Sequence, residues 1–152
     1  MGYVEDLRLV VGHRPLILVA GVALIFDEQE HLLLIERSDD RQWAVVGGLM
    51  EPGETVEETV RREVHEEVGL ELGALQLLGV LSGPDAFHVY PNGDQVYGVA
   101  VAYAARHPGP EPQPDPSEAL QARFFALNAL PANLRKTTAF YLKLYAEAAH
   151  HG

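Results

Sequence analysis

Hydrophobic residues form short continuous runs along most of the chain, and polar or glycine- and proline-rich segments separate them. The longest run covers residues 15–26, and four polar residues separate it from a second run at residues 31–37. Short apolar runs bounded by turn residues are typical of buried strands, and two runs joined by a short polar connection predict a hairpin. The same pattern predicts further strands at residues 75–81, 87–90, 95–105 and 120–127.

Turn and loop signals divide the second half of the chain. Asn92 and Gly93 lie between two predicted strands and favour a tight hairpin, because both residues accept positive φ angles. Residues 107–116 carry proline at every second position, which excludes a helix or central strand and predicts a stiff loop. Apolar and aromatic residues from 134 to 149 recur with helical period and predict a C-terminal helix that covers the sheet. The residues before Pro15 are expected to add a short helix or an edge to the core.

The sequence also predicts a helix at residues 56–68. Thr55 and Glu58 form a capping box, and Gly69 suits the position just after a helix C-terminus. At about 100° per residue, one apolar stripe runs along this helix and is expected to pack on the sheet. The stripe consists of Val56, Val60, Val64 and Val68.

Three glutamates share the flank beside that stripe. Glu63, Glu66 and Glu67 fall within an arc of about 100°. Like charges three or four residues apart destabilise a helix by about 0.2–0.5 kcal/mol per pair, and the macrodipole disfavours anions in the last turn. A divalent cation such as Mg²⁺ would compensate, since it prefers carboxylate oxygen and is usually shared with substrate phosphates. The alternative is a solvated acidic face, which we favour for Glu57 and Glu58 in the first turn.

Composition narrows the class of protein. With 152 residues, 47% of them hydrophobic, residues 1–152 are expected to form a single domain with one core. The absence of cysteine excludes disulfides, thiolate metal sites and cysteine nucleophiles, and it fits a cytoplasmic location. A formal charge of −11 opposes binding to a nucleic acid polymer or an anionic membrane. The longest apolar run is too short to span a bilayer.

Three other catalytic motifs are excluded. Residues 48–55 have the glycine spacing of a P-loop, but the segment ends in Glu-Thr where Lys and Ser or Thr belong. His65 and Glu66 begin like a zinc protease signature, yet Gly69 replaces its second histidine. No serine lies in a G-x-S-x-G setting, which excludes a nucleophile elbow.

The segment from Gly48 to Leu70 resembles the Nudix box, G-x5-E-x7-R-E-U-x-E-E-x-G-U, where U is a bulky aliphatic residue. A chance match has a probability on the order of 10⁻⁹ per starting point. The strands before the box and residues 122–131 also look like the family, so the resemblance spans most of the chain. One departure is Val46, where family members usually have proline before the paired glycines. Every specified position of the box is filled, by Gly48, Glu54, Arg62, Glu63, Val64, Glu66, Glu67, Gly69 and Leu70.

The resemblance implies an α/β Nudix fold, with a mixed β-sheet sandwiched between helices. It also implies a hydrolase in which water attacks phosphorus and Mg²⁺ or Mn²⁺ is the cofactor. By analogy with the family, Arg62 orients a glutamate, and Glu54 supports the loop or joins the site. The metal ligands implied by the resemblance are Glu63, Glu66, Glu67 and a loop carbonyl at Gly47.

A further glutamate outside the box occurs in several family members, shortly before the aromatic residue of the last strand. Glu118, six residues before Phe124, occupies a comparable place. It is either a catalytic residue or a plain loop residue. Which carboxylate acts as the general base stays open.

The resemblance leaves three functions open. The favoured one is cleavage of the diphosphate in a nucleoside diphosphate linked to another moiety, such as ADP-ribose or another nucleotide sugar. The alternatives are a nucleoside triphosphate pyrophosphohydrolase that cleans the nucleotide pool and a catalytically silent nucleotide-sensing domain. The expected partner is a small nucleotide, and a homodimer is left open. Aromatic side chains could stack a base, although in predicted strands they are more often core; these are Trp43, Phe87, Tyr90 and Tyr97.

Overall fold

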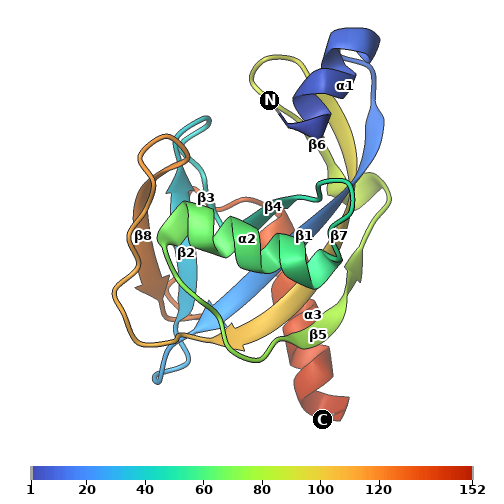
Figure 1. Ribbon diagram of the computed structural model, residues 1–152. Helices are drawn as coiled ribbons and strands as arrows, with labels where there is room; N and C mark the ends of the chain where they lie inside the picture. Colours follow the sequence, from blue (N-terminus) through green and yellow to red (C-terminus); the bar gives the residue numbers. More distant parts are fainter. Residues whose placement is uncertain (1, 152) are drawn as a thin grey trace.

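The structure is a computed structural model that describes residues 2–151. Its centre is a mixed eight-stranded sheet (Figure 1). Only β1 and β7 run parallel to each other, and the other pairs of described strands are antiparallel. The main path through the sheet is β3 (Trp43–Ala44), β2 (Leu32–Arg37), β1 (Leu16–Phe26), β7 (Gln95–Arg106) and β5 (Gln76–Leu81). Three strands lie off this path: β4 (Val46–Leu49) pairs with β1, β6 (Phe87–Val89) with β7, and β8 (Ala119–Phe125) with β2.

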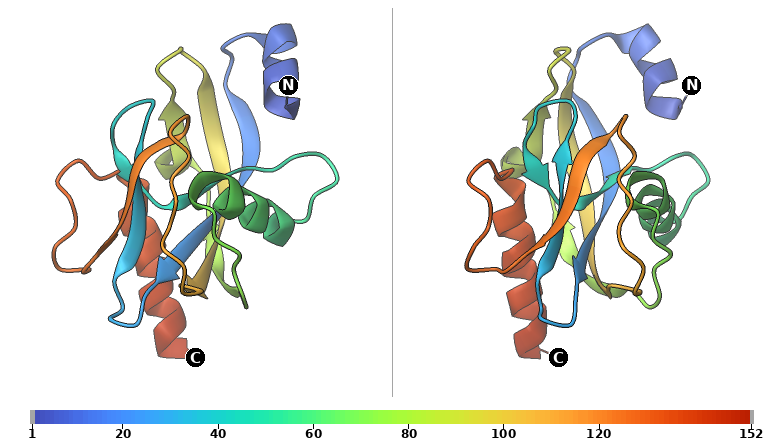
Figure 2. Two further views of the ribbon diagram at one scale, coloured as in Figure 1. Left: turned by 60° about the vertical axis from the view of Figure 1, so that its left-hand side comes forward. Right: turned by 90° about the vertical axis from the view of Figure 1, so that its left-hand side faces the viewer.

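Two helices cover opposite faces of the sheet (Figure 2). One is α2 (Val56–Val68) and the other is α3 (Thr137–His151). A short 3₁₀ helix, η1 (Pro84–Ala86), lies between β5 and β6. This three-layer arrangement confirms the predicted sandwich of a mixed sheet between helices.

Both faces of the central strands are buried, which explains their continuous hydrophobic runs. Successive side chains of a strand point to opposite faces, so β1 and β2 contribute to two cores. Ile25 and Leu33 pack with the valine stripe of α2. Leu24 and Phe26 pack on the other side, against Tyr141 of α3.

The hairpin formed by β1 and β2 and the extent of α2 agree with the sequence-based predictions. Phe26 pairs with Leu32, and α2 runs from Val56 to Val68 with the capping box in place. Gly69 closes the helix with φ 68°, in the left-handed region that glycine adopts without strain.

The hairpin between β6 and β7 also forms, but its turn differs from the prediction. Gly93 has φ 93°, whereas Asn92 keeps a negative φ. The Gly93 N–H donates to the Tyr90 carbonyl, and the Tyr90 N–H donates to the Asp94 carbonyl, both at 2.9 Å. Pro91 at the second position presets the φ of a type I turn, which explains the longer connection.

The N-terminal residues form α1 (Tyr3–Val11), which buries none of its residues. The expected short helix is therefore present, but it does not extend the core, and it lies at one end of the sheet (Figure 1). Arg8 holds it by donating to the Gln95 carbonyl at 2.7 Å, and His13 lies 2.7 Å from Asp94. Within residues 2–151, the helices are all too short or too polar to cross a bilayer.

Candidate active site

Helix α2 lies close to β4 because glycine occupies the contact. A Cβ atom on Gly48 would lie 2.6 Å from both carboxylate oxygens of Glu63, closer than real Cβ atoms approach other atoms. The N-terminal end of α2 is fixed by its capping box, in which Thr55 and Glu58 exchange hydrogen bonds. These contacts place the acidic flank of α2 directly beside β4.

Three carboxylates meet at this place, and we call them the acidic cluster: Glu63, Glu67 and Glu118. Each offers one oxygen, and these oxygens all lie within 4.8 Å of one another. Glu63 and Glu67 come from α2, whereas Glu118 precedes β8, where its carbonyl accepts from the Ser38 N–H at 3.1 Å. The structure thus brings Glu118 to the same place as Glu63 and Glu67, two of the four glutamates of the Nudix box.

Two oxygens of the acidic cluster lack partners. Glu67 is only 2% exposed, and its Oε1 accepts from the Gly47 N–H at 3.3 Å. Its Oε2 and the Oε2 of Glu118 are buried without a hydrogen-bond partner among the described residues. Buried polar atoms are normally paired, and an ion is one recognised explanation for an exception. Carboxylate oxygens are the ligands that Mg²⁺ prefers, so the cluster fits a hard divalent cation.

Burial shifts the acid–base properties of the cluster. It raises the pKa of Glu67 to about 9, with the neighbouring charge of Glu63 as the next cause. Burial also raises the pKa of Glu63, and burial followed by the charge of Glu63 raises that of Glu118. Without a cation, at least one of these groups therefore holds a proton at neutral pH. A bound cation would reverse this effect because it stabilises the charged form.

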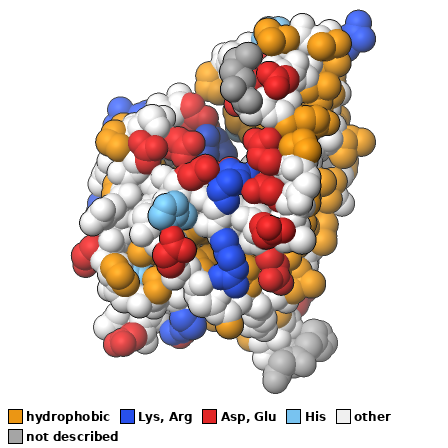
Figure 3. Space-filling model, viewed as in Figure 1, with side chains coloured by type: hydrophobic (Ala, Val, Ile, Leu, Met, Phe, Trp, Pro, Cys, Tyr) orange, Lys and Arg blue, Asp and Glu red, His pale blue; other side chains and the backbone are white. Residues whose placement is uncertain are grey.

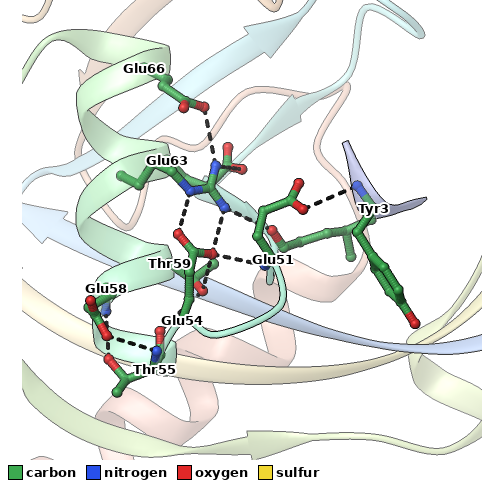
Figure 4. A network of polar contacts seen from close by, with 10 residues as sticks. Tyr3, Glu51, Glu54, Thr55, Glu58, Thr59, Glu63 and Glu66 are labelled. Carbon is green, nitrogen blue, oxygen red and sulfur yellow. Dashed lines mark hydrogen bonds and ion pairs between the residues drawn. The ribbon is translucent and has the colours of Figure 1, made fainter. Parts of the chain in front are cut away.

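Arg62 links the cluster to the loop before α2 by binding Glu54 and Glu63, both of which are labelled in Figure 4. Its Nε and one terminal nitrogen donate to the two oxygens of Glu54, at 2.6 and 2.9 Å. The other terminal nitrogen donates to Glu63 at 2.9 Å. Hydrogen bonding to Arg62 lowers the pKa of Glu54 to about 2, so Glu54 stays charged. This geometry fits the predicted role of Arg62 as the residue that orients a glutamate.

Glu54 faces the loop and not the acidic cluster. Its Oε1 accepts from the Glu51 N–H at 2.8 Å and from the Thr59 hydroxyl at 3.0 Å. Glu51 in turn accepts from the Tyr3 N–H at 3.2 Å (Figure 4). Of the two roles considered for Glu54, the contacts favour support of the loop.

Two of the four predicted metal ligands, Glu66 and Gly47, do not belong to the acidic cluster. The Glu66 side chain is 47% exposed, and its carboxylate contacts Arg62 at 3.3 Å, outside the acidic cluster. Gly47 lies in β4 opposite Val22 and not in a loop. Acidic side chains surround basic ones on this face of the molecule (Figure 3). Glu66 therefore lies beside Arg62 and outside the cluster.

A pocket of about 370 Å³ adjoins the cluster, because Gly47 and Gly48 form part of its wall. Arg37, at the end of β2, also lines it and lies near enough to Glu67 to favour the charged form of that carboxyl. Basic residues farther along the chain, Arg135 and Lys136, line it as well. Sequence reasoning missed these three residues, since no motif or spacing connects them.

The four aromatic candidates for base stacking separate into two groups. Trp43 is buried and packs edge-on against Phe125, which confirms the core interpretation for this residue. Phe87 and Tyr90 line the pocket. Tyr97 is 40% exposed and packs on Phe87, with ring centroids 4.7 Å apart. Two aromatic rings are thus available to a ligand in the pocket.

Gly48→Ala is expected to lower turnover by about a hundredfold, which corresponds to about 2.7 kcal/mol of transition-state stabilisation. The added methyl group would displace the flexible end of Glu63, so folding should suffer less than activity. Gly73→Ala is the matched control, because nothing lies within 4 Å of the Cβ position there. Steady-state kinetics and thermal unfolding of both variants check this. Normal turnover of Gly48→Ala would show that the position of Glu63 is unimportant.

Glu118→Gln is expected to lower turnover by about tenfold or more, as loss of a base or ligand usually does. Glu111→Gln, an exposed change in the preceding proline-rich loop, serves as the control and should leave the rate unchanged. The same kinetic assay measures both variants. Equal rates would assign Glu118 to the loop.

Comparison with known proteins decides the family. A sequence model of the NUDIX domain matches residues 15–148. The chain belongs to the Nudix family. Its structure is similar to that of a MutT NUDIX hydrolase from Burkholderia pseudomallei, with a TM-score of 0.72 and 32% identity over 85% of this chain and 98% of that one. Both the predicted resemblance and the predicted fold are thereby confirmed.

Curated relatives of this Nudix chain carry different names, and two of them illustrate the range. An ADP-ribose pyrophosphatase from Methanocaldococcus jannaschii is 37% identical over 120 residues, which is 77% of this chain and 65% of that protein. A NAD-capped RNA hydrolase, NudC, from Vibrio vulnificus is 35% identical over 106 residues, which is 68% of this chain and 37% of that protein. The matched regions cover less than two thirds of both curated relatives.

Proposed function

We propose that this Nudix chain is a metal-dependent hydrolase that cleaves the diphosphate of a nucleoside diphosphate linked to another moiety. ADP-ribose or another nucleotide sugar is the favoured substrate. The observation that carries the proposal is the acidic cluster with its two unpartnered buried oxygens beside a pocket lined by basic residues. The similarity to an ADP-ribose pyrophosphatase over most of this chain supports the choice of substrate.

The acidic cluster would hold Mg²⁺ or Mn²⁺, with Glu66 and the Gly47 carbonyl as the further ligands implied by the family. When bound, the cation neutralises phosphate charge and lowers the pKa of a coordinated water. Arg62 keeps the Glu63 carboxylate in place through its 2.9 Å hydrogen bond. A carboxylate of the cluster takes the proton from the attacking water, and Glu118 is the candidate from outside α2.

The pocket beside β4 would receive one moiety of the substrate. Arg37 lines the pocket near Glu67, where its guanidinium can contact a phosphate of the scissile diphosphate. Phe87 and Tyr90 offer aromatic rings to a base or sugar. A small nucleotide suits a pocket of about 370 Å³, and the net charge of −11 disfavours a nucleic acid polymer as partner.

A nucleoside triphosphate pyrophosphohydrolase is the second candidate, and a short segment of sequence supports it. Over 45 residues, or 26% of this chain, the sequence is 51% identical to the nucleoside triphosphatase NudI from Escherichia coli. The catalytically silent sensor is disfavoured, because a sensor does not need three carboxylates held together at an energetic cost. The homodimer, the cytoplasmic location and the single domain stay predictions.

A substrate screen with resolved products tests the proposal. With Mg²⁺ or Mn²⁺ present, ADP-ribose should yield AMP and ribose 5-phosphate. Nucleoside monophosphate and pyrophosphate from a triphosphate would select the second candidate instead. Ligand-induced stabilisation without any turnover would select the sensor.

Turnover is expected to require a divalent cation and to rise toward alkaline pH. The cluster needs a cation to hold its carboxylates in the charged form, and both the attacking water and its base must lose a proton. The pH–rate profile, measured at saturating Mg²⁺ and again in excess chelator, checks this. Full turnover in chelator would contradict the proposed mechanism.

A further inference from the structure

We propose that the pocket beside β4 contains a second anion-binding subsite at Lys136, so that the moiety bound there carries a phosphate of its own. This phosphate is separate from the diphosphate that is cut. The inference rests on the proposed function in taking the pocket as the place of one substrate moiety. It adds a statement about substrate class, namely a nucleotide derivative with a phosphate monoester on that moiety.

The charge of the pocket lining is the first observation. The chain has 22 acidic and 11 basic residues, yet no acidic residue lines this pocket in the described part of the chain. Arg37, Arg135 and Lys136 all line it. A pocket that is lined by basic side chains and by no acidic ones favours an anionic ligand, even in a protein of net negative charge.

Lys136 differs from the two arginines because its charge is uncompensated. Arg37 is paired with Asp39 at 3.1 Å, and Arg135 with Asp40 at 2.9 Å. Within residues 2–149, Lys136 has no carboxylate within 4.0 Å and is exposed. A lysine ammonium with no internal partner is free to bind a phosphate as a point charge.

A second unpaired polar group lies in the same pocket. His88 on β6 lines it, and its Nε2 is buried without a hydrogen-bond partner among the described residues. Burial, followed by the nearby charge of Arg135, lowers the pKa of His88 and so favours its neutral form. A neutral imidazole can donate one hydrogen bond to a phosphate oxygen.

The position of Lys136 separates this subsite from the acidic cluster. Lys136 lies immediately before α3, whereas Glu63 and Glu67 lie on α2, and the two helices cover opposite faces of the sheet (Figure 2). Gly47 and Arg37 line the pocket where it adjoins the cluster. The scissile diphosphate would therefore lie beside Gly47 and Arg37, and Lys136 is left for another anionic group.

Equilibrium binding of paired probes tests the subsite without any chemical step. Adenosine 2′,5′-bisphosphate and adenosine 3′,5′-bisphosphate are compared with AMP, and ribose 1,5-bisphosphate is compared with ribose 5-phosphate, all by calorimetry in excess chelator. The adenosine probes test the case in which the nucleoside moiety of the substrate occupies the pocket, and the ribose probes test the case in which the other moiety does. In at least one pair, the wild-type protein is expected to bind the bisphosphate about tenfold or more tightly than the monophosphate.

Lys136→Ala should remove that preference, and Lys136→Arg should retain most of it. Lys143→Ala is the matched control, since Lys143 is exposed on α3, which begins directly after Lys136, and does not line the pocket. The subsite is disproved if every pair binds with equal affinity, or if the preference survives in Lys136→Ala. Because no hydrolysis is measured, failure of the subsite leaves the proposed function standing, and an inactive enzyme leaves the binding test intact.

Discussion

Replacing Glu67 by glutamine is expected to lower turnover by a hundredfold or more and, in the metal-free protein, to raise thermal stability. A hundredfold loss corresponds to about 2.7 kcal/mol of transition-state stabilisation. Repulsion along the helix alone would make the stability gain only about 0.2–0.5 kcal/mol per pair. The burial of Glu67 makes the gain larger, because a buried charge loses its hydration. Kinetics and thermal unfolding in chelator measure the two effects.

The stability gain should depend on pH in a defined direction. The pKa of Glu67 is raised from its ordinary value of 4.5 to about 9. Its contribution to the stability of the metal-free fold is therefore fully present below about pH 4.5 and is lost as the pH rises to about 9. Between pH 6 and pH 9, the melting temperature in chelator should fall more for wild type than for Glu67→Gln. Parallel curves together with near-normal turnover would contradict the placement of Glu67.

Glu66→Gln provides the graded comparison on the same helix. Its carboxylate is half exposed and contacts Arg62, so the variant should lose less turnover than Glu67→Gln and gain less stability. Mg²⁺ should stabilise both variants less than wild type, because stabilisation by a ligand falls with affinity for the folded state.

Arg62→Lys is expected to lower turnover by about a hundredfold with little change in KM. The guanidinium contacts Glu54, Glu63 and Glu66 at once and also donates to the Leu49 carbonyl at 3.1 Å. A lysine ammonium cannot reproduce this fork of donors. The free energy of unfolding should fall by about 1–3 kcal/mol, since part-buried acceptors lose their donors.

Arg61→Lys is the control for Arg62→Lys. Arg61 precedes Arg62 on α2, and its side chain donates to the Leu72 carbonyl, away from the acidic cluster. Its replacement should leave kcat unchanged. If Arg62→Lys retained full kcat while losing stability, Arg62 would be a structural residue only.

Local signals in the sequence were sufficient for most of the fold. Capping by Thr55 and termination at Gly69 depend on neighbouring residues alone, so the bounds of α2 could be predicted. The strands were visible as apolar runs because α2 and α3 cover both faces of the sheet. The turn at Asn92 was predicted wrongly in detail, since Pro91 sets its conformation.

The candidate site depended on contacts between distant segments, which the sequence showed only in part. The helical projection placed Glu63 and Glu67 on one flank of α2. The burial of Glu67 could not be predicted in this way, because it depends on the packing of α2 against β4 and the segment before β8. Family resemblance suggested Glu118, whereas no local pattern did. The pocket residues Arg37 and Lys136 come together through the fold alone, without any spacing that sequence reasoning could use.

Binding of Mn²⁺ to the metal-free protein, followed by the electron paramagnetic resonance signal of the free ion, tests the central claim most directly. The claim is that the acidic cluster holds the divalent cation on which hydrolysis depends. Wild type should bind Mn²⁺, and Glu67→Gln and Glu118→Gln should each weaken the affinity by about tenfold or more, as the loss of site groups does. Glu57→Gln, an exposed change in the first turn of α2, should bind as wild type does. Unchanged affinity in both cluster variants would contradict the account.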